Sequence, residues 1–287
     1  MTETTQPGEY EIVIADKLRG LVTSERLAAN AYNYEVMHWE PSPLEGRQLE
    51  AIRARLLGMP LLHGTQNPDV LEIAKRDGLL PYVRTTGDEG NSFPVDHSLG
   101  LDEYVFMNWG RLDQYHGNHF VVVDARAMLE GTIVTPDDIV HCSRNMVDLK
   151  PRAYQDLSDG EKAIIDQEYL DKMVTGDVWL DIVARQVHQF ASRKPDLPFP
   201  VSRHKAIGEV KRYGSLDPRF CLGSFSLPDA SSSLRATSAW NDSLLKYGIA
   251  VNIEEANLPE KGKMLRYDVG GPELWQQAGW QEIMAIE

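Results

Sequence analysis

Cysteine is scarce in this sequence, and a long apolar run is absent. Only Cys142 and Cys221 occur among 287 residues. This is too few for a disulfide framework, so we interpret both as reduced thiols. No apolar run approaches the ~20 residues that a membrane-spanning helix needs. The first residues lack the basic start and apolar centre of a secretory signal. We therefore expect a cytoplasmic protein with no membrane partner.

Basic residues are the minority among the charged ones. Lys and Arg number 29 against 43 Asp and Glu, which gives a net charge of −14 and argues against broad, nonspecific nucleic-acid binding. Residues 193–219, here called the basic segment, depart from this balance, because they hold seven basic and three acidic residues. This local charge indicates either an anionic ligand or a solvated strand face. The basic residues are Arg193, Lys194, Arg203, Lys205, Lys211, Arg212 and Arg219.

Several signatures of common enzyme classes are also absent. The sequence contains no Walker loop, no dinucleotide fingerprint and no serine elbow, which argues against an ATPase, a Rossmann dehydrogenase and an α/β-hydrolase. His116 and His119 lie close together, but no Cys or acidic cluster completes a ligand set. We expect no metal.

Apolar residues and turn formers predict short strands alternating with helices. A helix is expected from the capping box at Ser42 to Leu57, with Gly58 ending it. A strand over 59–62 and a helix over 68–77 follow, with Asn67 as the cap and Gly78 at the end of that helix. Further strands are expected at 10–15, 104–109, 119–124, 132–134, 206–210, 220–225 and 249–253, helical segments at 125–130, 158–190 (with a break near Gly176) and 234–247, and a long loop at 81–100.

The polar triplet His63-Gly64-Thr65 lies between the strand and the helix that follow Gly58. Glycine there lets a ligand approach the backbone, and the flanking side chains can hydrogen-bond that ligand. The same triplet also fits a capped strand–helix junction with a partly exposed histidine.

The triplet resembles the first NAD-binding segment of the ADP-ribosyltransferases, in the poly(ADP-ribose) polymerase-like and DarT-like branch. Two later segments are similar to further motifs of that family, in the same order. Tyr104 in Glu-Tyr-Val-Phe matches the tyrosine of the second motif, and Glu209 opens a run over 208–220 that resembles the last motif. The resemblance covers roughly residues 59–225. It implies an α+β fold in which two small, mostly antiparallel sheets form a split NAD cleft surrounded by helices.

The resemblance also implies how NAD, the expected cofactor and substrate, would be held. His63 would hydrogen-bond the adenosine ribose, Gly64 would pair through its backbone with the nicotinamide amide, and Thr65 would stay near the ribose. Tyr104 would stack on nicotinamide. The alternative interpretation is that Tyr104 is an aromatic residue of the core or of a sheet edge. Arg111 would assist NAD binding and catalysis as a DarT arginine does; its alternative is a solvated turn residue.

Glu209 is the residue to which the resemblance assigns catalysis. Transfer of ADP-ribose breaks the nicotinamide–ribose bond through a transition state like an oxocarbenium ion, so a carboxylate is needed beside the reacting ribose. The alternative is an ordinary exposed acid at the start of a strand. One departure concerns specificity, because Ile207 stands where toxins that modify protein side chains carry Glu or Gln.

The acceptor is expected to meet the loop that precedes the catalytic glutamate. Here that loop is basic, which favours a nucleic-acid acceptor, DNA or RNA, held through its phosphates. A toxin- or defence-like enzyme of this kind would have an antitoxin or immunity protein as a partner. Two alternatives stay open: transfer to a protein side chain, and a non-catalytic acidic binding or inhibitory protein on the same fold. The expected acceptor contacts are Arg193, Lys194, Arg203 and Lys205.

The resemblance also divides the chain. Residues 1–58 are expected to form a helical accessory segment, 59–225 the catalytic core with a helical insertion at about 141–192, and 226–287 an extension packed on the core.

Overall fold

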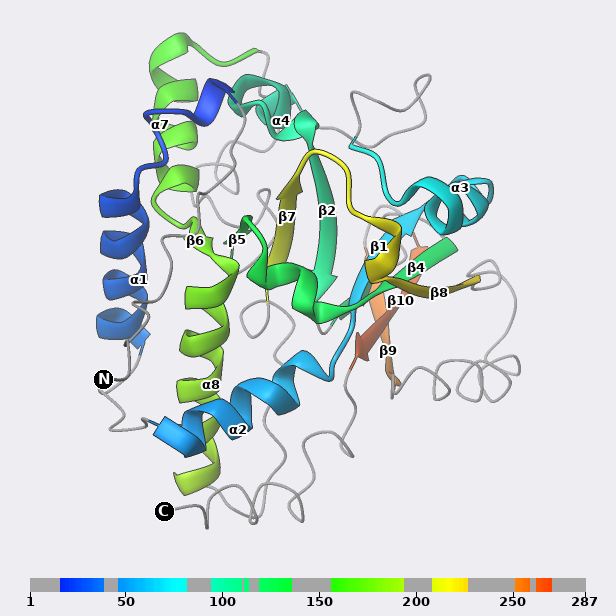
Figure 1. The fold of residues 1–287 in the computed structure, drawn as a ribbon. Coiled ribbons are helices and arrows are strands. Elements are labelled where there is room, and N and C mark those ends of the chain that lie inside the picture. The colour runs from blue at the N-terminus through cyan, green and yellow to red at the C-terminus, as the bar shows by residue number, and fades with distance from the viewer. Residues whose placement is uncertain are drawn as a thin grey trace, which may run out of the picture.

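The computed structural model describes residues 16–38, 46–81, 94–109, 111–113, 119–135, 156–193, 208–226, 251–258 and 262–269. These residues form helices and antiparallel sheets (Figure 1), which confirms the mixed class of the predicted fold, but the sheets are not both small, because one has seven strands. None of the described helices is long and apolar enough to cross a membrane.

The larger sheet has seven strands in the order β6-β5-β7-β2-β1-β4-β8. All its pairings are antiparallel. Its strands are β1 (Leu61–Thr65), β2 (Tyr104–Trp109), β4 (His119–Val123), β5 (Thr132–Thr135), β6 (Val174–Thr175), β7 (Glu209–Tyr213) and β8 (Cys221–Ser226).

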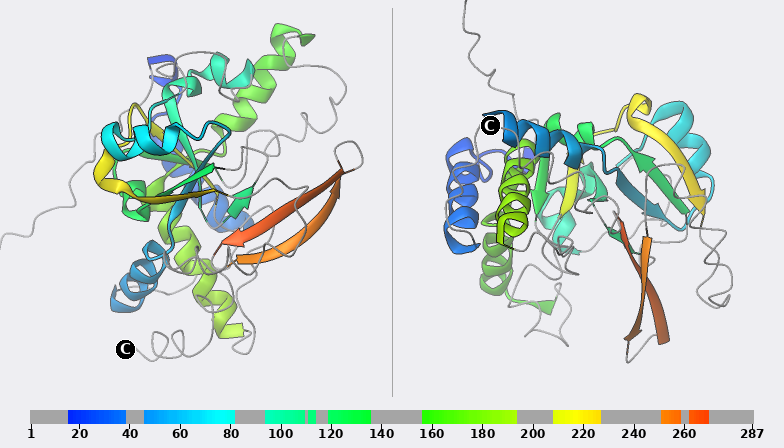
Figure 2. Two further views of the ribbon diagram at one scale, coloured as in Figure 1. Left: turned by 90° about the vertical axis from the view of Figure 1, so that its right-hand side faces the viewer. Right: turned by 90° about the horizontal axis from the view of Figure 1, so that it is seen from below.

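The smaller sheet has three strands in the order β3-β10-β9. It joins β3 (Arg111–Asp113), directly after β2, to the hairpin of β9 (Val251–Leu258) and β10 (Gly262–Val269). Figure 2 shows this hairpin, in orange and red, extending away from the larger sheet.

The helices are α1 (Ser24–His38), α2 (Gly46–Leu57), α3 (Val70–Asp77), α4 (Pro94–Leu99), α7 (Asp159–Leu170) and α8 (Gly176–Arg193). Short 3-10 turns precede α1 and β2 and follow β4 and β7. Alternating residues of the central strands, such as Val105, Met107 and Trp109 of β2, pack with α2 and α8 in the main core. On the other face, Tyr104 and Ile133 pack against residues of α7 in a second cluster. Both faces at the β5–β7–β2 end of the sheet are therefore covered.

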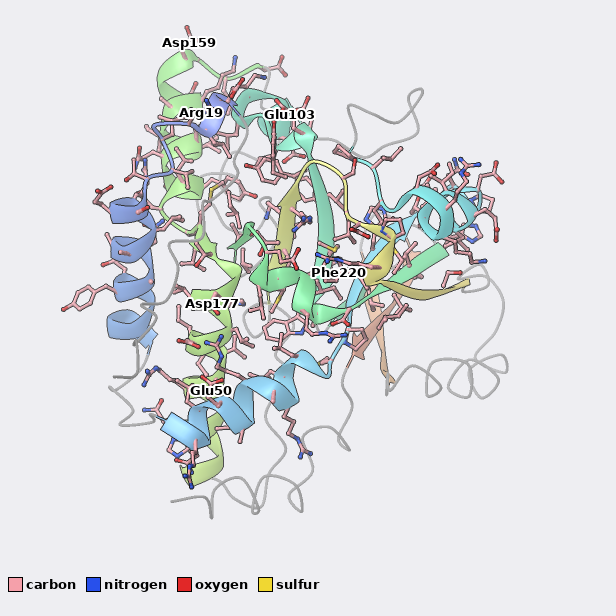
Figure 3. All side chains as sticks on the ribbon, viewed as in Figure 1. Arg19, Glu50, Glu103, Asp159, Asp177 and Phe220 are labelled. Carbon is pink, nitrogen blue, oxygen red and sulfur yellow. The ribbon has the colours of Figure 1, made fainter. Side chains whose placement is uncertain are left out.

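Arg53 of α2 connects that helix to α8. Its guanidinium pairs with Asp177 at 2.6 Å and also with Asp181, and it lies 3.9 Å from Glu50 on its own helix. Figure 3 labels Glu50 on α2 and Asp177 on the neighbouring α8. Ile52 and Leu56 of α2 lie in the same core cluster as the central strands, so residues 46–57 pack directly on the sheet.

Several sequence predictions are confirmed. The helix that ends before Gly58 is α2, and the strands expected at 104–109, 119–124 and 132–134 are β2, β4 and β5. Ser158 and Glu161 form the expected capping box at the start of α7. The predicted break near Gly176 is also present, because the two-residue strand β6 separates α7 from α8.

Other predictions were wrong in their boundaries. The triplet at 63–65 does not follow the strand but forms part of β1, since all five β1 residues pair with β4. Residues 94–99 of the expected loop form α4, and Arg111 lies in a strand rather than in a turn. The strand expected at 206–210 begins at Glu209 and continues to Tyr213, because it pairs along its whole length with β2.

Neither β6 nor β10 was predicted, and the strand expected at 249–253 overlaps the longer β9. The predicted strand at 10–15, the capping box at Ser42 and the helix at 234–247 lie outside the described residues.

Candidate functional site

The three segments that resemble ADP-ribosyltransferase motifs lie on three adjacent strands. Glu209 begins β7, Tyr104 begins β2, and His63 lies within β1. The order β7-β2-β1 is continuous in the middle of the larger sheet (Figure 1). Segments far apart in the sequence are thus neighbours through backbone pairing.

Glu209 lies in a row of residues that crosses the sheet. It is directly opposite Asn108 of β2 on one side and Thr135 of β5 on the other, and Asn108 is opposite Leu62 of β1. Directly opposed residues of antiparallel strands point to the same face. The polar side chains Thr135, Glu209 and Asn108 therefore share one face of the sheet.

Gly208 sets the start of β7. Its φ of +85° is unfavourable for any residue that has a Cβ. A Cβ added at this position would also lie 2.5 Å from the Thr135 carbonyl oxygen. The Gly208 carbonyl also accepts a hydrogen bond from the Trp109 backbone N–H at 3.2 Å. This close approach of β7 to β5 and β2 fixes where Glu209 enters the sheet.

Glu209 is buried and paired with a buried lysine. Glu209 is 6% exposed and Lys211 is 0% exposed. The Glu209 Oε2 atom lies 2.5 Å from the Lys211 Nζ atom. Lys211 Nζ also donates to the Thr135 hydroxyl at 2.7 Å. Two buried charges in contact neutralise each other, whereas either alone would be strongly unfavourable.

Two aromatic rings complete the surroundings of Lys211. Nζ lies 5.3 Å from the ring centre of Phe106 and 5.4 Å from that of Tyr169 of α7. Both distances are within the range of a cation–π contact. The ammonium is therefore held by a carboxylate, a hydroxyl and two rings.

His63 lies where β1 and β2 separate. The ladder between these strands contains two pairs, Leu61 with Trp109 and Leu62 with Asn108. Immediately beyond it, Nδ1 of the half-buried His63 donates to the Phe106 carbonyl at 2.8 Å, because a carbonyl oxygen can only accept. In the neutral ring this leaves Nε2 as the acceptor nitrogen.

Gly64 and Thr65 are positioned differently from His63. Strand alternation puts Leu62 and Gly64 on the Glu209 face, and His63 and Thr65 on the opposite one. The Thr65 hydroxyl accepts a hydrogen bond from the Asn67 backbone N–H at 3.1 Å, which begins the turn before α3. Of the triplet, Gly64 is thus the residue that shares a face with Glu209.

Tyr104 does not fit the expected role as a nicotinamide platform. It is 1% exposed, belongs to the second core cluster and packs edge-to-face on Tyr213, with ring centres 5.4 Å apart. A ring enclosed in this way has no face for a ligand. Phe106, two residues further along β2, is half-buried and lies on the Glu209 face.

Arg111 lies in β3, paired with Asp268 of β10, and not in the larger sheet. Among the expected acceptor residues, Arg193 is the last residue of α8, and Lys194, Arg203 and Lys205 lie outside the described residues.

The remaining cations of the basic segment have acidic or carbonyl partners. Lys211 pairs with Glu209, Arg219 pairs with Glu130 at 2.9 Å, and Arg212 donates to the Glu130 carbonyl. From 208 onward, the cations of the basic segment therefore all have partners within the described part of the chain, Lys211 in the core and Arg219 at the surface.

Sequence reasoning missed Lys211, Thr135, Asn108 and Phe106. The position of Lys211 could have been predicted, because residues two apart in a strand lie on the same face and Lys211 follows Glu209 by two. Thr135 and Asn108 carried no such signal, because cross-strand register brings them beside Glu209. Within the described residues, no group of three or more His, Cys, Asp or Glu is placed to hold a metal ion.

Searches of family models, curated proteins and solved structures gave no match to this chain.

Proposed function

We propose that this chain is an NAD-dependent ADP-ribosyltransferase, of a toxin- or defence-like kind, that transfers ADP-ribose to a nucleic acid. One observation carries the proposal: the three motif-like segments, separated in the sequence, lie on the adjacent strands β7, β2 and β1. This adjacency is what a shared site formed by the three segments requires.

The separation of β1 from β2 supports a split cleft for NAD. Beyond Leu62 the two strands no longer form a ladder, and Gly64 follows there without a side chain on the Glu209 face. A dinucleotide can approach the backbone most closely at such a position. The nicotinamide amide would pair with the Gly64 backbone, whereas the His63 side chain lies on the opposite face of the sheet.

Glu209 would supply the chemistry. As the nicotinamide–ribose bond breaks, its electron pair leaves with nicotinamide and positive charge develops on the ribose. The Glu209 carboxylate would stabilise that charge and hold the ribose 2′-hydroxyl. Phe106 would take the aromatic position expected of Tyr104, because it is less buried and lies on the same face as Glu209.

The test is incubation with adenylate-labelled NAD⁺ and pooled protein, DNA and RNA. The native chain should label one pool, and Glu209→Gln should lower that labelling by about 10³-fold or more. Glu130→Gln is the matched control, since it also removes a carboxylate charge, from an exposed ion pair. Label in protein alone would replace the nucleic-acid acceptor by a protein side chain. Undiminished labelling by Glu209→Gln would contradict the assignment.

A second candidate function is favoured by the burial of this site. The buried Glu209–Lys211 pair and the enclosed Tyr104 also suit a non-catalytic binding or inhibitory protein, in which these residues only stabilise the sheet. That function predicts no loss of NAD⁺ with the native chain and a stable, stoichiometric partner.

A further inference from the structure

We infer that Lys211 is a positioning residue for Glu209: it fixes the orientation of the carboxylate on which transfer depends. This inference rests on the proposed function. Lysine is almost never fully buried in a protein unless it is paired with another group. Lys211 is 0% exposed in the middle of β7.

The contacts of Lys211 hold its ammonium from separate elements. Glu209 of the same strand lies 2.5 Å away, and Thr135 of β5 accepts at 2.7 Å. The Phe106 ring of β2 and the Tyr169 ring of α7 lie over the same nitrogen. Because three elements besides β7 contact Nζ, the ammonium cannot turn away without breaking several interactions.

A fixed ammonium restricts Glu209 in turn. Glu209 and Lys211 are two residues apart in one strand, so their side chains leave the same face, and the ion pair holds Oε2. The ammonium also offsets the buried charge of the carboxylate, which would be strongly unfavourable alone. The groups opposite Glu209 on both neighbouring strands, Asn108 and Thr135, carry no charge.

Lys211 would act only through Glu209. Its position between Glu209, Thr135 and two rings leaves it no direct role toward the ribose. A residue of this kind should affect turnover more than NAD⁺ binding, because it orders a group that acts in the transition state.

The experiment measures kcat per folded molecule and KM for NAD⁺ in four variants. Lys211→Met should lower kcat by about 100-fold with KM changed less than about threefold, and Lys211→Arg should recover part of the loss. A purely structural role would leave the kcat of the folded molecules at the native value.

Thr135→Val covers the outcome in which Lys211→Met fails to fold. It removes the hydroxyl that holds Nζ and leaves both charges in place. It should lower kcat by about 3- to 10-fold, with Thr135→Ser close to the native value. If the native chain turns over NAD⁺ and Lys211→Met keeps the native kcat, the inference about Lys211 is overturned and the proposed function stands. If Lys211→Met does not fold, the native kcat in Thr135→Val overturns the inference in the same way. No turnover by the native chain would overturn the proposed function, and this inference with it.

Discussion

At the residue scale, the chemistry of a side chain in this protein depends on its burial and its immediate partners. Lysine and glutamate usually lie at the protein surface, yet the sheet buries Lys211 and Glu209 together as an ion pair. Tyr104 could serve a ligand only if one face of its ring were open, and packing on Tyr213 closes it. A hydrogen bond to Glu103 also raises the pKa of the Tyr213 phenol, so this ring stays neutral beside Tyr104.

Cys221 gives a prediction at this scale. Burial, with the nearby Asp217 carboxylate, raises the pKa of its thiol to about 11. At pH 8 its thiolate fraction should therefore be about 100-fold smaller than that of an unperturbed cysteine with pKa near 9. We expect iodoacetamide to modify Cys221 correspondingly slowly in the folded protein, with a rate that rises about tenfold per pH unit up to about pH 10.

A Cys142→Ser variant isolates this signal, since the sequence contains only these two cysteines. The same variant unfolded in urea provides the reference rate. Equal rates in the folded and unfolded states at pH 8 would show that the thiol is not protected.

At the scale of secondary-structure elements, the capping box at Ser158 and the break at Gly176 were predicted correctly, whereas the strand ends and the Asn67 cap were not, since α3 begins at Val70 with Asp69 as its N-cap. Ser158 with Glu161, and the break at Gly176, were correct because each depends on residues close in sequence. The ends of β1 and β7 were wrong because pairing with β4 and β2 extends them. The two-residue β6 exists only because β5 lies beside it.

Gly78, at the end of α3, gives the prediction for an element. It has a φ of +83°, and an added Cβ would lie 1.8 Å from the Leu216 carbonyl oxygen, part of the backbone bridge between Leu79 and Leu216. Gly78→Ala should lower the free energy of unfolding by about 3 kcal/mol or more, because the backbone must move as well as adopt a strained φ.

Gly214→Ala is the matched control for Gly78→Ala. Gly214 has a similar φ of +70°, but a Cβ there would meet nothing within 4 Å. Its cost should be about 1 kcal/mol, from strain alone. Urea denaturation of the two variants measures the difference, and equal losses would mean that the contact with Leu216 relaxes freely.

At the scale of the whole molecule, the net negative charge of the chain opposes the nucleic-acid acceptor of the proposed function. A net charge of −14 repels nucleic acid, so an acceptor of that kind would need a local cationic surface. Of the basic segment, the described cations from Lys211 to Arg219 are committed to acidic or carbonyl partners. Under the proposed function, acceptor binding would therefore depend on the residues before Gly208.

Charge reversal tests whether the basic residues before Gly208 bind the acceptor. Arg203→Glu combined with Lys205→Glu should lower labelling of a nucleic-acid acceptor by about tenfold, because two phosphate contacts become repulsive. Hydrolysis of NAD⁺ without acceptor should keep the native rate. The control pair Lys75→Glu and Arg76→Glu makes the same charge change on the exposed surface of α3. If the double variant keeps both activities, the loop before Glu209 is not the acceptor site.

The sequence by itself determined that the fold combines helices with strands, and it supplied the three short segments on which the proposed function rests. Both depend on local patterns, namely the alternation of apolar residues, capping residues and the order of a few polar ones. Only the tertiary structure decided that these segments are adjacent, that Gly64 rather than His63 shares a face with Glu209, and that Lys211 neutralises Glu209. The physical reason is that strand register and burial arise from pairings between distant residues, which no local pattern specifies.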